Sequence, residues 1–139
     1  MIRVCAADTN GAYSVVEIVS ESGDGTPIHI HQHEDEHFLV LEGTVRIAYG
    51  DETFDAPAGA SVTLGRGVSH AWCNASDSPV RMVVIASPGG CEEALRIIAK
   101  GGDIDFVALS QRFGIRHLGP MLTRDSRLAW STPRVTPVP

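Results

Sequence analysis

Side chains that commonly bind metals are concentrated in one short stretch of this 139-residue chain, PIHIHQHEDEHFLVLEG, at residues 27–43. Four of the six histidines lie within nine positions there, beside three acidic residues. His29 and His31 are two residues apart, so on a strand both imidazoles point to the same face. Glu36 follows a short polar turn and can return from the next strand. His70, at the start of the segment HAWCN, is a fourth candidate.

Three imidazoles and one carboxylate make a site for one divalent transition ion. Imidazole nitrogen suits Zn, Fe, Cu and Ni better than Ca or Mg, so the ion is expected to be Fe, Mn, Ni, Cu, Co or Zn. Four protein ligands leave one or two positions open on a metal that takes five or six. An open position is typical of a catalytic or ligand-binding metal. If the site is catalytic, Glu36 either stays a ligand or leaves the metal and takes a substrate proton as general base.

Apolar residues are predicted to wall a pocket around these ligands. Phe38 and Val40 share strand parity with Glu36, so they face the same side. Tyr49 and Trp72 hold plausible inward positions on later strands. Both are predicted to line the pocket, with ordinary core packing as the alternative.

Two neighbouring histidines are expected to stay out of the ligand set. His33 falls in the turn, although a His31–His33 pair is an alternative that would leave two residues before Glu36. His37 points away from the Glu36 face if the strand is regular. We therefore expect neither of them to bind the ion.

Three further polar residues are expected at the surface. Glu34 and Asp35 lie in the turn and are predicted to be solvated, with backbone N–H groups as possible partners. His117 lies near the proline-rich end of the chain and is predicted to be a surface residue.

Strands must position the ligand residues, and short β-rich segments fill the first ninety residues at regular spacing. Glycine, proline, asparagine and aspartate mark the turns between them, which favours a sandwich or barrel. The predicted strands are residues 12–20, 28–31, 36–42, 44–49, 52–56, 60–64, 69–74 and 80–87.

The chain changes character after a Pro-Gly-Gly turn at residues 88–90. Two helices are predicted beyond it, the second with Asp103 as its N-cap, and a proline-rich extended tail follows them. The predicted helices are residues 91–100 and 103–113. The predicted organisation is a β-barrel at 1–90, helices packing on it at 91–116, and a tail at 117–139.

Composition excludes several classes of partner. The net charge is −6 and Lys100 is the only lysine, which argues against a nucleic-acid surface. The longest apolar run, residues 82–86, is too short to cross a bilayer, and no apolar segment behind the first residues indicates a signal peptide. We therefore expect a cytoplasmic protein that binds a small molecule and contacts no membrane.

Two spaced motifs resemble those of the cupin superfamily. The first, G-x5-H-x-H-x(3,4)-E-x6-G, occupies residues 23–43, and every fixed position matches. The second, G-x5-P-x-G-x2-H-x3-N, occupies residues 59–74 and departs only at Gly65, where the motif has a turn proline. The resemblance implies an all-β jelly-roll barrel with a short C-terminal helical extension. It also implies the metal ligands His29, His31, Glu36 and His70.

The SPGG turn, the helices and the segment GIRHLGP are similar to bacterial single-domain cupins labelled quercetin dioxygenase-like. That resemblance implies a metal-dependent dioxygenase acting on a small hydroxy-keto or flavonol-like compound. Two alternatives stay open: a metal-dependent isomerase or lyase of a sugar or keto acid, and a cupin that binds a small ligand without catalysis. Barrels of this family commonly pair, so a homodimer is expected.

Overall fold

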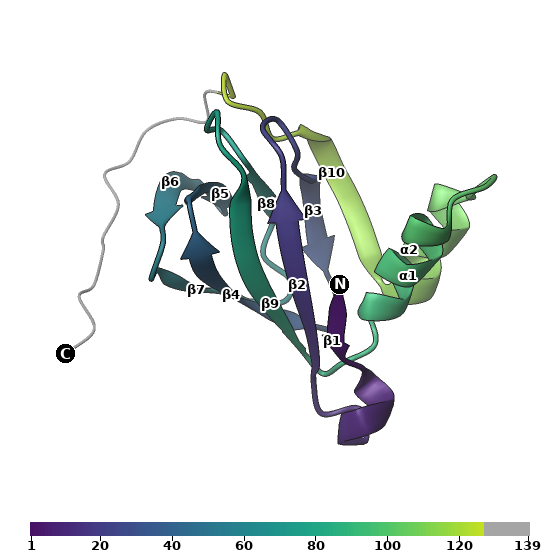
Figure 1. Cartoon of the computed structure of the whole chain (residues 1–139). Helices are drawn as coiled ribbons and strands as arrows, with labels where there is room; N and C mark the ends of the chain where they lie inside the picture. The colour runs from purple at the N-terminus through teal and green to yellow at the C-terminus, as the bar shows by residue number, and fades with distance from the viewer. Residues whose placement is uncertain (127–139) are drawn as a thin grey trace.

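Two antiparallel sheets face each other, with a pair of short helices beside them (Figure 1). The computed structural model describes residues 1–126. The first sheet has the order β1-β2-β9-β4-β7, and the second has the order β10-β3-β8-β5-β6. The strands are β1 (Ile2–Val4), β2 (Ser14–Ser20), β3 (Pro27–His31), β4 (Asp35–Glu42), β5 (Thr44–Tyr49), β6 (Glu52–Pro57), β7 (Ser61–Leu64), β8 (His70–Cys73), β9 (Val80–Ser87) and β10 (Ile115–Met121).

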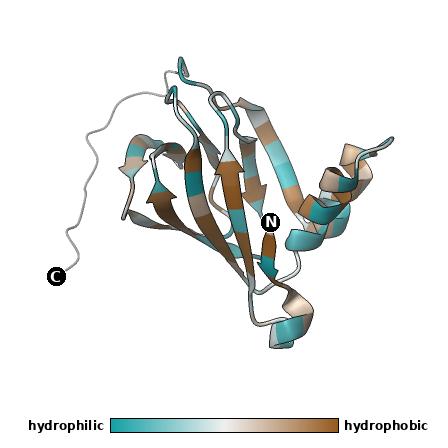
Figure 2. Ribbon diagram, in the orientation of Figure 1, coloured by the Kyte–Doolittle hydropathy of each residue, from teal (hydrophilic) through white to brown (hydrophobic). Residues whose placement is uncertain are grey.

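The core lies between the two sheets, because the strands alternate apolar inward positions with more polar outward ones. Along β9 every second residue is buried, and Met82 is completely inaccessible. Phe38 on β4 and Ile47 on β5 belong to the same core cluster. Figure 2 shows hydrophobic residues dominating β2 and β9, while the helices are mixed. The predicted all-β jelly-roll fold is confirmed.

All eight predicted strands are present, each beginning and ending within two residues of its predicted bounds. One prediction for the end of the chain is wrong. Residues 117–121, expected in an extended tail, belong to β10, which pairs with β3 and places His117 opposite His29. Proline is tolerated there because β10 is an edge strand, and the register shifts between His117 and Met121. The predicted tail beyond residue 126 lies outside the described part of the chain.

Helices α1 (Glu92–Lys100) and α2 (Phe106–Phe113) contact β2 and β10, respectively. Asp105, rather than the predicted Asp103, caps α2: its carboxylate accepts hydrogen bonds from the N–H groups of Val107 and Ala108, both at 3.0 Å. A 3₁₀ turn, η1 (Ala6–Thr9), follows β1. Within residues 1–126, no helix combines the length and apolar character needed to cross a membrane.

Candidate metal centre

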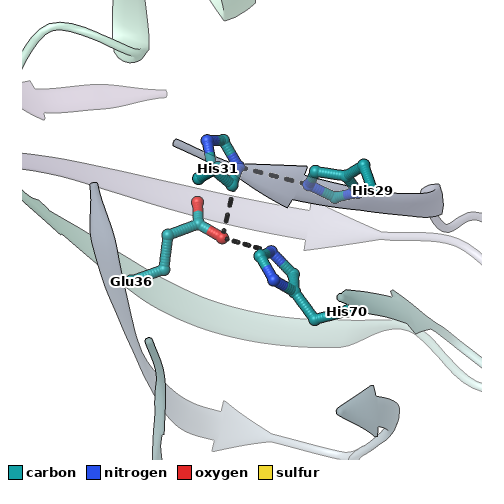
Figure 3. A group of neighbouring side chains, drawn as sticks. All are labelled: His29, His31, Glu36 and His70. Carbon is teal, nitrogen blue, oxygen red and sulfur yellow. Dashed lines mark hydrogen bonds and ion pairs between the residues drawn. The ribbon is translucent and has the colours of Figure 1, made fainter. Parts of the chain in front are cut away.

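The four predicted ligands come together between the two sheets (Figure 3). His29 and His31 extend from β3, and His70 extends from β8, where it is paired directly with His29. Glu36 comes from β4 in the opposite sheet. One ligand atom from each side chain lies within 4.8 Å of the others, so the group could hold a metal ion.

Short contacts link the four side chains in the order His29, His31, Glu36 and His70. Nε2 of His29 lies 3.2 Å from Nε2 of His31. Oε2 of Glu36 lies 3.6 Å from Nε2 of His31 and 3.1 Å from Nε2 of His70. All three imidazoles are buried, and water therefore competes little for these atoms.

The other ring nitrogen of each histidine faces an oxygen atom. Nδ1 of His29 lies 2.7 Å from the carbonyl oxygen of Pro27, and Nδ1 of His70 lies 3.2 Å from that of Val68. A carbonyl oxygen can only accept a hydrogen bond, so each Nδ1 carries the proton in these contacts. Nδ1 of His31 lies 3.4 Å from Oε2 of Glu34. Outer partners of this kind orient metal-binding histidines.

These contacts make the site suitable for a cation. With the protons on Nδ1, the three Nε2 lone pairs and the Glu36 carboxylate face one another as acceptors without a donor between them. A divalent transition ion at their centre would satisfy all four. This donor set, nitrogen-rich with one carboxylate, fits such an ion and suits calcium or magnesium poorly.

The surroundings shift the pKa values of three of the four side chains. Burial lowers the pKa of His29 to about 4, so its imidazole is neutral at pH 7. Burial alone would raise the pKa of Glu36, but the neighbouring imidazoles, His70 first, outweigh it and lower the pKa. Burial also opposes charge on His31, yet Glu34 and Glu36 raise its pKa.

Glu34 is a residue whose role the sequence reasoning missed. It was expected to be a solvated turn acid, but it is only 6% exposed. Its Oε2 and Nδ1 of His31 have no fully aligned hydrogen-bond partner within residues 1–126, although they lie 3.4 Å from each other. The spacing of three residues between His31 and Glu34 was the one feature of the sequence that could have indicated this contact. Glu34 therefore faces the outer nitrogen of a candidate ligand.

Replacing Glu34 by alanine is expected to weaken metal binding by about 10- to 100-fold, because His31 loses the acceptor that orients its ring. Glu34→Gln retains an acceptor oxygen and should lose less. Competition with a chromogenic chelator measures both affinities. Glu92→Gln is the control, since Glu92 is also buried but accepts hydrogen bonds from the N–H groups of Ala6 and Gly90. An equal loss in the Glu34 and Glu92 variants would show that Glu34 has no specific effect on the site.

A cavity of about 460 Å³ adjoins the cluster. His29, His31 and Glu36 line it, whereas His70 is 1% exposed and is not among its lining residues. Most of the remaining wall is apolar, contributed by both sheets and by α1 and α2. Among residues 1–126, no lysine or arginine lines this cavity.

The predicted pocket residues divide into two pairs. Phe38 and Trp72 line the cavity. Val40 does not, because it lies farther along β4 within the core cluster. Tyr49 also does not, and its hydroxyl oxygen instead accepts a hydrogen bond from the N–H of Gly65 at 3.1 Å. Strand parity correctly placed these side chains inward but could not tell how far along the barrel each one lies.

The remaining histidines lie outside the cluster. His37 contacts Thr63 and Ser61 on the outer face of the first sheet, both at 2.7 Å. His33 packs against Gly114. His117 is exposed, as predicted, but it also lines the cavity, with its ring centroid 6.2 Å from that of His29. Its pairing opposite His29 explains this position, and it depends on a strand that was not predicted.

Comparison with protein families gives one match over half of the chain: residues 16–86 fit the model of the cupin domain. Among curated proteins, mannose-1-phosphate guanylyltransferase 2 of Escherichia coli O157:H7 is 29% identical over 80 residues, 58% of this chain and 17% of that protein. The RfbM mannose-1-phosphate guanylyltransferase of Salmonella typhimurium is 27% identical over 107 residues, 77% of this chain and 20% of that protein. The chain thus spans a small part of these relatives.

Solved structures show the same fold. The protein TT1209 from Thermus thermophilus has a TM-score of 0.54 at 24% identity, over 56% of this chain and 74% of that one. A cupin-superfamily sugar phosphate isomerase from Silicibacter pomeroyi has a TM-score of 0.52 at 22% identity, over 58% of this chain and 55% of that one. At such identities the likeness concerns the fold alone.

Proposed function

This chain belongs to the cupin family, and on that premise we propose that it is a metal-dependent dioxygenase acting on a small compound with adjacent hydroxyl and keto oxygens. The observation that carries the proposal is the position of the cluster on the wall of the cavity. His29, His31 and Glu36 line the cavity, so a ligand in the cavity would have access to an ion that these residues held.

The residues of the site have separate roles in this reaction. His29, His31 and His70 would hold the ion, which when bound supplies a Lewis acid and a template for the substrate oxygens. Glu36 would complete the ligand set or accept the proton of the substrate hydroxyl as a general base. Phe38 and Trp72 line the cavity and would keep its wall apolar there. Both atoms of dioxygen enter the products as a carbon–carbon bond of the substrate breaks.

The cavity supports this substrate class better than a phosphorylated sugar. A phosphate would bring negative charge next to Glu36, into a cavity whose described lining has no lysine or arginine. Burying an unpaired charge is unfavourable. The alternative, a metal-dependent isomerase or lyase of a sugar or keto acid, draws its support from the names of the sugar phosphate isomerase and guanylyltransferase relatives. A cupin that only binds a small ligand is the third hypothesis.

Oxygen uptake tests the proposal. Metal-free protein is reconstituted in turn with Fe, Mn, Ni, Cu and Co and mixed with flavonols and diketones in an oxygen electrode. We expect at least one metal to support oxygen consumption matched by substrate loss, and ¹⁸O₂ to label both incorporated positions. Turnover of a sugar or keto acid without oxygen would favour the isomerase or lyase. Tight ligand binding without turnover by any metal would favour the binding protein.

A further inference from the structure

The polar side chains of the cavity wall outside the cluster are mostly engaged within the protein. Ser110 on α2 and His117 on β10 are hydrogen-bonded to each other at 3.1 Å. The hydroxyl oxygen of Thr26 accepts a hydrogen bond from the N–H of Trp72 at 3.2 Å. The cluster around Glu36 is therefore the main place where the cavity can engage a polar group of a ligand.

Apolar residues of the two helices form a different part of the same cavity. Leu95 and Ile98 on α1 and Phe106 on α2 line it, and we call these three residues the helical wall. They are 43%, 44% and 57% exposed, respectively. Large apolar side chains grouped around a cavity while open to water are typical of a surface that a ligand covers. Covering them is favourable in proportion to the apolar area removed from water.

We infer that the ligand is an amphiphile with two parts: a metal-chelating oxygen pair at one end, and an uncharged hydrocarbon body that lies on the helical wall. The inference rests on the proposed function for the chelating end, and it adds the residues that select the substrate. A volume of about 460 Å³ has room for both parts, since sites for drug-sized ligands begin at about 300 Å³. Leu95, Ile98 and Phe106 are then specificity residues, distant in sequence from the ligand motifs.

A series of alkyl hydroxamates tests this, because each binds a metal through two oxygens and differs only in chain length. The full chain is loaded with zinc, which has no redox chemistry, and titrated by calorimetry with acetohydroxamate through octanohydroxamate. We expect the affinity to rise about fourfold for each added methylene until the wall is covered.

Two adjacent residues of α2 provide matched variants. Phe106 lines the cavity, whereas Val107 is 68% exposed and does not. Both lie in the first turn of α2, where an added aspartate is favourable to the helix, so both variants should fold. Phe106→Asp should weaken octanohydroxamate binding at least tenfold and leave acetohydroxamate binding unchanged. Val107→Asp should change neither.

The outcomes separate the inference from the proposed function. If no hydroxamate binds the zinc-loaded protein, the proposed function is overturned and the inference with it. If acetohydroxamate binds but longer chains bind no better, the inference alone is overturned. If the dependence on chain length survives in both Phe106→Asp and Ile98→Gln, the hydrocarbon body lies elsewhere, and the assignment to the helical wall is overturned.

Discussion

Replacing His29 and His70 by alanine together is expected to weaken transition-metal binding at least about a thousandfold. Four-ligand zinc sites contribute about 10–16 kcal/mol of binding free energy, so removing two of four ligands costs several kcal/mol. The two substitutions also break both ends of the cluster, since His29 contacts His31 and His70 contacts Glu36. Elemental analysis of untagged protein purified without chelator should find about one equivalent in the parent and almost none in the variant.

His33→Ala is the matched control for this measurement. His33 lies in the same histidine-rich stretch but packs against Gly114 outside the cluster, so its loss should leave the metal content unchanged. Glu36→Gln is nearly isosteric, so it removes a charged ligand without leaving a buried cavity. Circular dichroism checks that each variant folds. A parent that neither contains nor takes up metal would overturn the metalloenzyme proposal. Equal metal content in the parent and in the folded double variant would show that the ion binds elsewhere in the protein.

Phe38→Ala is expected to lower the free energy of unfolding by about 3–5 kcal/mol, because the ring is 1% exposed in the centre of the core cluster. The midpoint of thermal unfolding should then fall by roughly 10–15 °C for a domain of this size. Phe38 also lines the cavity beside Glu36, so the space left would widen the reacting end. Calorimetry in the absence of added metal measures the effect on the fold alone.

Leu39→Ala provides the comparison, because the next residue of β4 points to the other face and is 38% exposed. The Leu39→Ala substitution should lower the free energy of unfolding by less than about 1 kcal/mol, as is usual for substitutions away from the core. Similar losses at the two positions would contradict the orientation of β4, on which the placement of Glu36 also depends.

The geometry of the candidate site could be predicted wherever it follows from local periodicity. Two histidines with one residue between them on a strand necessarily share a face, and this brought His29 and His31 to the same place. The turn after His31 returned the chain to Glu36, and the second motif supplied His70. The strands themselves were predictable from their composition and the turns between them.

Long-range contacts were not predictable in this way. Glu34 lies among polar residues typical of an exposed turn. Its burial depends on how this turn folds against His31, which the local sequence does not show. His117 reaches the cavity because β10 pairs with β3, although Gly119 and Pro120 give that segment little strand character. The homodimer and the metal stay predictions, because they concern molecules other than this single chain. The roles of the residues within the site stay predictions too, because they depend on the bound ion and substrate.

The position of β3 between β8 and β10 has a consequence for synthesis on the ribosome. The strand that carries His29 and His31, residues 27–31, is translated before both of its neighbours, residues 70–73 and 115–121. A nascent chain therefore exposes both edges of this strand until β8 has emerged, and one edge until β10 has emerged. The four-residue cluster therefore cannot form until β8 has been translated and has paired with β3, although two of its imidazoles are made well before that.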